Sequence, residues 1–239
     1  MCNLSASLLL DVLGQQRFGV EYQPLIHTGT GDIVAYEALA RFYDQAGATL
    51  RTDHVFHALH DSPLTLFQAE YQMKRLQIDF APAGTLFLNL DPDAYTVAMQ
   101  NDDTHPLLDL ICPRRDVVLE IIENSDLSDA RQSARMADAF AQRQVRLALD
   151  DIGAPHSMLS LPLLIQVDCL KFDRSWLSQL DCPLYRAALL SLITYARETG
   201  KQTVMEGIET DAQLALARSL GVDLVQGFLY RPLFIVQQA

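Results

Sequence analysis

The stretch Leu147-Ala148-Leu149-Asp150-Asp151-Ile152-Gly153 is an apolar run that ends in two adjacent carboxylates and a glycine. Such a run is typical of a buried parallel strand, and its polar end marks where the strand leaves the fold. Two unpaired carboxylates about 4 Å apart repel by roughly 4 kcal/mol at an effective dielectric near 20, so this pair favours a bound cation, most simply a divalent metal. The alternative is a solvated turn, because Asp-Asp before Gly is also ordinary turn chemistry.

The composition narrows the class of protein and its ligands. The chain has 239 residues, 49% of them hydrophobic, which suffices for one large barrel or two small domains with a sizeable core. A net charge of −12 argues against DNA, RNA and anionic membranes as partners. A phosphate-bearing ligand would therefore need metal ions to offset this charge.

Cysteine usage and the N-terminus bear on the compartment. The four cysteines include no Cys-x-x-Cys pair, which indicates reduced thiols in a cytoplasm. Asp11 interrupts the run Leu8-Leu9-Leu10, and no basic residue precedes that run, so a signal peptide is not expected. No apolar run approaches the length of a membrane span.

Strand and helix patterns alternate along most of the chain. The strand candidates Val20 to Ile26 and Ile33 to Arg41 are joined by Thr28-Gly29-Thr30-Gly31, which predicts an antiparallel hairpin. Helices are predicted over about 5–13, 64–78, 126–143, 183–200 and 210–221. Further strands are predicted over 86–90, 117–121, 146–150, 169–172, 203–205 and 224–225.

This order predicts an α/β fold, a TIM-type (β/α)8 barrel whose first strand pair is antiparallel. An open doubly wound sheet remains possible from the pattern alone. No linker, low-complexity tract or charge run divides the chain, so we expect a single domain over residues 1–239.

Polar residues recur where the predicted strands end, and barrel strands deliver their carboxyl ends to one rim. Repetition at successive strand ends is far stronger evidence than any single residue. Hard oxygen ligands without nearby histidines favour Mg²⁺ or Mn²⁺ over Zn²⁺, and a cluster of this size can hold two ions, as suits in-line phosphoester hydrolysis. The strand-end residues are Glu37, Arg41, Asn89, Glu120, Glu123, Asp150, Asp151, Lys171, Asp173, Glu206, Glu209 and Gln226.

Some of these residues have plainer alternatives. Asp173 and Glu209 could instead orient a neighbour or cap the next helix, and Gln23, on an early strand, could pair only with backbone. His54, His57 and His60 resemble a row of metal ligands. Steps of three drift round a helix and carboxylate partners are lacking, so we interpret these histidines as a helix face.

The strand-end motifs resemble those of the EAL family of cyclic di-GMP phosphodiesterases, over nearly the whole chain. Each motif is weak alone, but their common order is highly specific. They are Gln23-Pro24-Leu25, Glu37-Ala38-Leu39-Ala40-Arg41, Leu88-Asn89-Leu90, Glu120-Ile121-Ile122-Glu123, Asp150-Asp151-Ile152-Gly153, Leu170-Lys171-Phe172-Asp173, Glu206-Gly207-Ile208-Glu209 and Gln226-Gly227.

The resemblance implies a barrel enzyme that opens cyclic di-GMP to linear pGpG with two Mg²⁺ or Mn²⁺ ions and is inhibited by Ca²⁺; it also implies a possible homodimer. The metal ligands would be Glu37, Asn89, Glu120, Asp150 and Asp151, with Asp150 bridging the two ions. Lys171 would position the attacking water, Glu206 would act as general base, and Glu123 would steady the loop after the Asp-Asp strand. Substrate would contact Gln23, Leu39, Arg41, Asp173 and Gln226.

The chain departs from the family after the aspartate pair. Most active members continue Phe-Gly-Thr-Gly-Tyr-Ser-Ser, whereas this chain reads Ile152-Gly153-Ala154-Pro155-His156-Ser157-Met158. We therefore expect a second metal that binds more weakly than the first. The rival hypothesis is an inactive EAL domain that senses cyclic di-GMP or binds a protein, and a more distant one is another metal-dependent phosphatase.

Overall fold

A closed ring of strands forms the centre of the computed structural model, which describes residues 4–97, 105–122, 127–155 and 158–238. The sheet order runs β1, β9, β8, β7, β6, β5, β4, β2, and β2 pairs back to β1. The predicted barrel is therefore confirmed, and the alternative of an open sheet is excluded. The ring strands are β1 (Phe18–His27), β2 (Ile33–Tyr43), β4 (Thr85–Asn89), β5 (Val117–Ile122), β6 (Arg146–Ile152), β7 (Cys169–Phe172), β8 (Gln202–Met205) and β9 (Leu224–Val225).

Strand β1 is the reversed member of the ring. It pairs antiparallel with both β2 and β9, while the pairs from β2 through β4 to β9 are parallel. This confirms the predicted antiparallel first pair. Two strands that the sequence did not predict, β3 (Thr49–Leu50) and β10 (Ile235–Gln238), extend the sheet beside β2 and β1.

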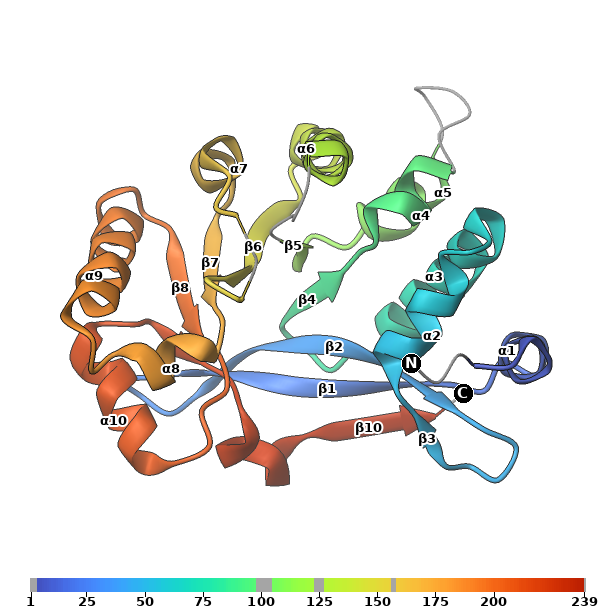
Figure 1. Cartoon of the computed structure of the whole chain (residues 1–239), viewed down its shortest axis with the longest axis horizontal. Helices are drawn as coiled ribbons and strands as arrows, with labels where there is room; N and C mark the ends of the chain where they lie inside the picture. The colour runs from blue at the N-terminus through green and yellow to red at the C-terminus, as the bar shows by residue number, and fades with distance from the viewer. Residues whose placement is uncertain (1–3, 98–104, 123–126, 156–157, 239) are drawn as a thin grey trace.

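Helices lie outside most of the ring, while β10 runs along β1 (Figure 1). A capping box of Thr210 and Gln213 starts α10 in the predicted range 210–221, and Gly221 ends it in the left-handed conformation. The predicted helix over 5–13 corresponds to α1, and α2 agrees with the helix-face interpretation of His54 and His57, whereas α4, α5, α7 and α8 were not predicted. The helices are α1 (Ala6–Gly14), α2 (Thr52–Leu59), α3 (Pro63–Asp79), α4 (Pro92–Val97), α5 (Pro106–Ile111), α6 (Leu127–Gln142), α7 (Leu161–Gln166), α8 (Ser175–Gln179), α9 (Pro183–Glu198), α10 (Asp211–Leu220) and the 3-10 helix η1 (Phe228–Leu233).

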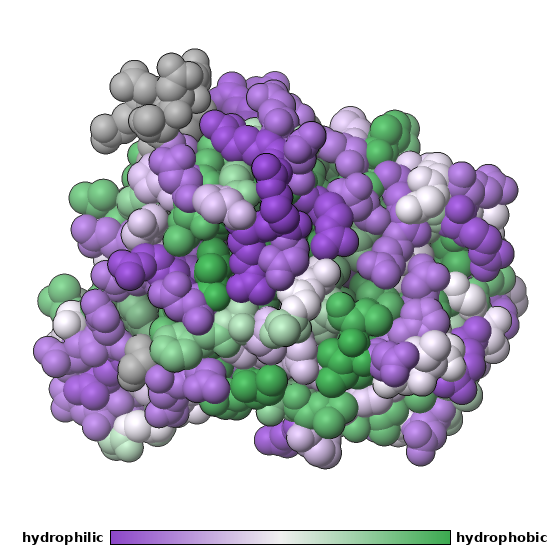
Figure 2. Space-filling model, turned by 180° about the vertical axis from the view of Figure 1, so that it is seen from behind, coloured by the Kyte–Doolittle hydropathy of each residue, from purple (hydrophilic) through white to green (hydrophobic). Residues whose placement is uncertain are grey.

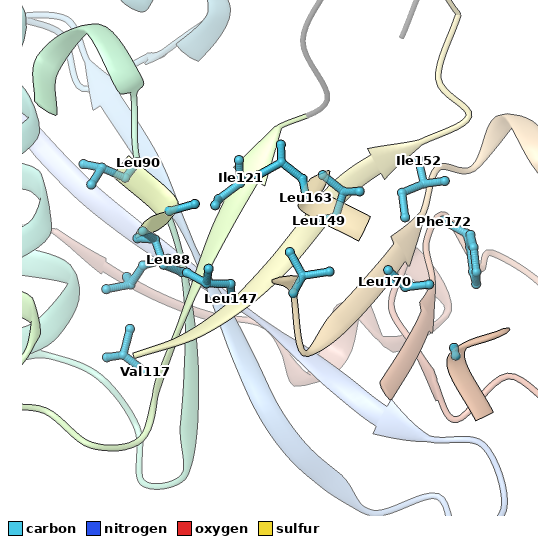
Figure 3. Packing of buried hydrophobic residues seen from close by; sticks show 14 of the residues in the cluster. Leu88, Leu90, Val117, Ile121, Leu147, Leu149, Ile152, Leu163, Leu170 and Phe172 are labelled. Atoms are coloured by element: carbon cyan, nitrogen blue, oxygen red, sulfur yellow. The ribbon is translucent and has the colours of Figure 1, made fainter. Parts of the chain in front are cut away.

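Alternate residues of each strand serve two different cores. The outward set packs against the helices, as Leu88, Leu147, Leu149 and Leu170 illustrate in Figure 3. The inward set fills the barrel with one buried side chain from each ring strand. These inward residues are Leu25, Ala35, Phe87, Val118, Ala148, Cys169, Val204 and Leu224.

The outer surface combines polar and apolar regions. Seen from behind, hydrophilic residues dominate the upper half and hydrophobic residues gather in the lower centre (Figure 2). None of the described helices combines the length and the apolar content that crossing a bilayer requires.

Candidate active site

A layer of polar side chains lies above the inward apolar layer, two residues further toward the rim on every strand. Because side chains alternate between faces with a period of two, these residues point into the same end of the barrel. On the reversed β1 the offset is two residues backward. The layer consists of Gln23, Glu37, Asn89, Glu120, Asp150, Lys171, Glu206 and Gln226, and all eight were predicted from strand ends or motifs.

The centre of this layer is Lys171, whose side chain is completely buried. Its Nζ lies 2.9 Å from Asp150 Oδ1, 2.8 Å from Glu206 Oε1 and 3.4 Å from Glu37 Oε2, and it also contacts Glu120 Oε1. One ammonium therefore faces four carboxylates. Burying that many charges with one counterion is costly, so the cluster favours additional positive charge.

The acidic groups respond unequally to this crowding. Burial, followed by the nearby carboxylates, raises the pKa of Glu120, of Asp150 and, to about 8, of Glu206. Burial also acts on Glu37, but Lys171 and two side-chain amides outweigh it and lower the pKa of that carboxyl. Burial would lower the pKa of Lys171, yet its carboxylate neighbours hold it well above the usual range. Lys171 is therefore a fixed positive charge.

Amide side chains orient Glu37. Gln226 Nε2 donates to Glu37 Oε2 at 2.6 Å, and Asn89 Nδ2 donates to Glu37 Oε1 at 3.0 Å. Gln226 Nε2 also lies 3.2 Å from Gln23 Oε1. Asn89 and Gln226 thus hold the Glu37 carboxylate in place, and Gln23 contacts Gln226. Gln23 contacts a side chain of the layer, beyond the backbone pairing that was its alternative.

Asp151 joins the layer through an irregularity in β6. Adjacent residues of a regular strand point to opposite faces, but the register of β6 against β7 shifts between Leu149 and Ile152. Asp151 itself has a φ of 56°, a left-handed conformation in which Asp is enriched among non-glycine residues. The bulge lets Asp150 and Asp151 line the same cavity. Burial and then Asp150 raise the pKa of Asp151 to about 6.

The start of the divergent loop is held by Trp176 of α8. Its Nε1 donates to the Ile152 carbonyl at 2.7 Å, and the Asp173 N–H donates to the same oxygen at 3.1 Å. Gly153 has a φ of 83°, and a Cβ there would lie 2.3 Å from Trp176 Nε1. The indole therefore packs directly on the backbone that follows Asp151. His156 and Ser157 lie outside the described residues.

The carboxylates fit divalent metal ions. Glu37, Glu120 and Asp150 each offer an oxygen within 4.8 Å of the others, and so do Asp150, Asp151 and Glu206. Asp150 belongs to both groups, as a bridging ligand would. Among the described residues no hydrogen-bond donor reaches the buried Glu120 Oε2, so this oxygen has an unused lone pair. An all-oxygen donor set suits Mg²⁺ or Mn²⁺.

A cavity of about 400 Å³ opens above the carboxylates. Its lining includes the predicted residues Gln23, Leu39, Asp173, Glu209 and Gln226.

Two predicted residues stand apart from this cavity. Among the described residues that line it, Arg41 is absent, because its Nη2 pairs with Glu21 at 2.7 Å. Glu123 lies outside the described residues.

Sequence reasoning missed two residues of the cavity wall, Arg174 and Phe228, and included Gly207 and Gly227 only as parts of motifs. Gly207 has a φ of 70°, and a Cβ there would lie 2.3 Å from Arg174 Cβ. Arg174 directly follows the motif that ends at Asp173, so a search for cations next to strand-end motifs could have found it.

One interpretation of the sequence was wrong. His60 does have carboxylate partners, because the segment after β4 brings Asp91 and Asp93 to its imidazole. Asp91 lies directly after the strand that was predicted over 86–90. His54 and His57 lie on α2, as the helix-face interpretation requires.

Comparison with known families gives a match across almost the whole chain: the model described as "EAL domain" matches residues 6–232. The chain belongs to the EAL domain family. The EAL chain is 28% identical over 230 residues to "Probable cyclic di-GMP phosphodiesterase PdeB" of Escherichia coli strain K12, covering 93% of this chain and 44% of that protein. It is 25% identical to "Cyclic di-GMP phosphodiesterase RocR" of Pseudomonas aeruginosa, covering 92% and 59%. It thus spans about half the length of these relatives.

Solved EAL structures share the fold. The Bacillus subtilis YkuI protein, in complex with c-di-GMP and calcium, superposes with a TM-score of 0.77 at 22% identity, covering 97% of this chain and 59% of that one. The "PaMucR Phosphodiesterase, c-di-GMP complex" gives a TM-score of 0.71 at 24% identity, covering 93% and 95%. The closed barrel of this EAL chain is therefore the fold that these proteins share.

Proposed function

We propose that this EAL domain is a metal-dependent phosphodiesterase that hydrolyses cyclic di-GMP to linear pGpG. The observation that carries the proposal is the polar layer of the barrel, in which four carboxylates surround Lys171 and Asp151 joins them from the β6 bulge. The kinship with proteins named cyclic di-GMP phosphodiesterases supports the choice of substrate. From the lack of a Cys-x-x-Cys pair we also infer a cytoplasmic location, and from the family resemblance an ability to form a homodimer.

Two ions of the Mg²⁺ or Mn²⁺ class would occupy the carboxylates. Glu37, Asn89, Glu120 and Asp150 would hold the first, and Asp150, Asp151 and Glu206 the second. When bound, such ions polarise a phosphoryl oxygen and lower the pKa of coordinated water. They also supply the positive charge that the carboxylates need and so allow a phosphodiester to approach an acidic protein. Ca²⁺, with looser coordination, should permit binding and support little hydrolysis.

The protein's own groups then have separate tasks. The Lys171 ammonium, fixed by its ion pairs, donates hydrogen bonds that orient the attacking water and the carboxylates around it. Glu206 accepts a proton from that water. Burial raises the pKa of Glu206 to about 8 in the metal-free protein, and bound cations would lower it, so that the ionised carboxylate would be available as a base near neutral pH. Glu123 would steady the loop that carries Asp151.

Groups on the cavity wall would bind the dinucleotide. Gln23 and Gln226 present amides that can hydrogen-bond a guanine edge, Leu39 offers an apolar surface, and Asp173 also lines the cavity. Arg41 would bind a phosphate after leaving Glu21. The alternative function, a sensor that binds cyclic di-GMP without turnover, is less favoured because every ligand position is filled by a competent side chain.

The test is an assay of purified protein with cyclic di-GMP and Mg²⁺ or Mn²⁺, with products separated by chromatography. We expect linear pGpG, no product after chelation, and loss of nearly all turnover in Glu37→Ala. The matched control is Glu70→Ala, which removes another buried carboxylate that belongs to a separate ion pair with Lys74. Intact substrate at saturating Mn²⁺, together with tight binding of the dinucleotide, would overturn the enzyme and favour the sensor.

A further inference from the structure

Outside the barrel mouth, three metal-ligating side chains converge where α2 ends and α4 begins. His60 directly follows α2, while Asp91 and Asp93 belong to the segment that follows β4. His60 Nε2 lies 3.0 Å from Asp91 Oδ2 and 3.7 Å from Asp93 Oδ2. One ligand atom from each residue lies within 4.8 Å of the other two. This cluster, His60, Asp91 and Asp93, is named the α2–α4 cluster below.

Contacts outside the α2–α4 cluster fix two of its side chains. His60 Nδ1 lies 2.7 Å from the Phe56 carbonyl, to which its N–H donates, so Nε2 faces the carboxylates and, once it loses its proton, can offer its lone pair to a metal ion. Asp91 Oδ1 accepts the backbone N–H of Asp93 at 2.8 Å and of Ala94 at 3.3 Å. That leaves Oδ2 directed at His60. A histidine that ligates a metal characteristically donates its other ring N–H in this way.

The distances within the α2–α4 cluster are close to those of ligands around one ion. Nitrogen and oxygen ligands lie about 2.0 to 2.2 Å from Zn²⁺, which places neighbouring ligand atoms about 3.3 to 3.6 Å apart in a tetrahedral site. The His60–Asp91 separation of 3.0 Å lies slightly below this range and the His60–Asp93 separation of 3.7 Å slightly above it. Small side-chain movements would bring both into the range, and the Asp93 side chain is 48% exposed. Solvent can supply the remaining ligands.

The charge around the α2–α4 cluster also favours a cation. Behind it, Glu70 accepts the Asp91 N–H at 3.2 Å, and Lys74 Nζ lies 2.8 Å from Glu70 Oε2. Lys74 therefore neutralises Glu70 and not the two aspartates. Within the described part of the chain, the ion pairs of Asp91 and Asp93 are with His60 alone.

We propose that His60, Asp91 and Asp93 form a further divalent-metal site, separate from the barrel mouth, that takes a borderline ion of the Zn²⁺ class. Imidazole among the ligands selects Zn²⁺ over Mg²⁺ or Ca²⁺, which prefer oxygen alone. Asp91 follows Asn89 of the polar layer by two residues, so a bound ion would tie the segment after β4 to the end of α2. Zinc at this site should raise the melting temperature of the protein.

Metal binding by the full chain tests this site without reference to turnover. Metal-free protein is dialysed against Zn²⁺, and bound zinc is measured per chain. We expect His60→Ala to bind one equivalent less than the wild type, and Asp93→Asn to bind that equivalent at least about tenfold more weakly. The control, His57→Ala, removes an exposed histidine from the same helix and should bind as the wild type does. Melting curves of the metal-free variants verify that each is folded.

Nuclear magnetic resonance of the imidazole nitrogens gives an independent reading. We expect Zn²⁺ to shift the Nε2 signal of His60 while its Nδ1 remains protonated, and to leave the signals of His57 unchanged. If the His60 nitrogens do not move and His60→Ala binds as much zinc as the wild type, the three residues are an imidazolium ion pair and no metal site exists there. Either result is independent of whether the barrel mouth hydrolyses cyclic di-GMP.

Discussion

The guanidinium of Arg41 lies 2.7 Å from the carboxylate of Glu21, across the β1–β2 hairpin. Gln23 Nε2 donates to the same carboxylate oxygen at 2.8 Å. Arg41 and Gln23, which are both proposed to bind the substrate, therefore contact the same carboxylate. Glu21 itself has no proposed role in binding metal or substrate. A phosphate that takes Arg41 must compete with Glu21.

Neutralising Glu21 should therefore strengthen substrate binding. An ion pair of this exposure is worth roughly 0.2 to 1 kcal/mol, so Glu21→Gln should lower the KM for cyclic di-GMP by up to about fivefold and leave kcat unchanged. Asp11→Asn is the matched control, because it breaks a similar ion pair, with Arg17. Steady-state kinetics of the three proteins provides the measurement. An equal change of KM in both variants would point to net charge rather than to release of Arg41.

Replacing Lys171 should destabilise the metal-free protein, because the carboxylates around it would lose their counterion. Lys171→Met leaves buried carboxylates without their counterion, which should lower the free energy of unfolding of metal-free protein by about 3 to 5 kcal/mol. Added Mn²⁺ should restore much of this loss, because the ion supplies charge to the same carboxylates. Lys74→Met is the control, since Lys74 is also buried but pairs with Glu70 alone. Urea unfolding with chelator and with Mn²⁺ measures the effect; equal rescue of both variants would contradict it.

Removing the indole N–H of Trp176 should weaken the second metal. Trp176→Phe keeps an aromatic ring on Gly153 but loses the hydrogen bond to the Ile152 carbonyl, worth about 0.5 to 1.5 kcal/mol. We expect the Mn²⁺ concentration for half-maximal rate to rise by up to about tenfold, with the rate at saturation unchanged. Tyr185→Phe, which retains the ring beside Trp176, should behave as the wild type. A metal titration unaltered by Trp176→Phe would show that the bulge holds Asp151 unaided.

His105 should make the fold sensitive to acid. Its Nε2 lies 2.8 Å from the Tyr95 carbonyl, and its Nδ1 accepts the Leu107 N–H, so the buried ring is neutral. Burial lowers the pKa of His105 below its ordinary value of 6.5.

Below that value the unfolded chain binds a proton that the folded chain does not, so stability falls as pH falls, by at most about 1.4 kcal/mol per pH unit. His105→Asn retains a capping side chain without this titration. Urea unfolding at about pH 7.5 and pH 5 should show the wild type losing more stability than the variant. Equal losses would exclude His105 as the cause.

The barrel and its polar layer were predictable because both follow from the alternation of side chains along strands. Once Asp150 was placed at the end of a buried strand, the same rule placed Glu120 and Lys171 beside it. The bulge at Asp151 was not predictable, because the conformation depends on pairing with β7 and not on local sequence. The ion pair between Arg41 and Glu21 was not predicted for a similar reason, because the contact depends on the register of the β1–β2 hairpin.

The partners of His60 show the other limit of sequence reasoning. Helical spacing describes what neighbouring turns of one helix share, whereas Asp91 reaches His60 from a segment about thirty residues later in the chain. Contacts between residues so far apart in the chain depend on how α2 and the segment after β4 pack together. The sequence around either residue does not indicate this packing.

The apolar layer beneath the carboxylates closes the barrel at the end opposite the cavity. Eight side chains, from Leu25 to Leu224, fill the barrel below the polar layer. In the proposed reaction, the described residues leave the opening above Lys171 as the route for substrate and product alike. Slow release of product would then delay binding of the next substrate, so product exchange would set an upper limit on the rate of turnover.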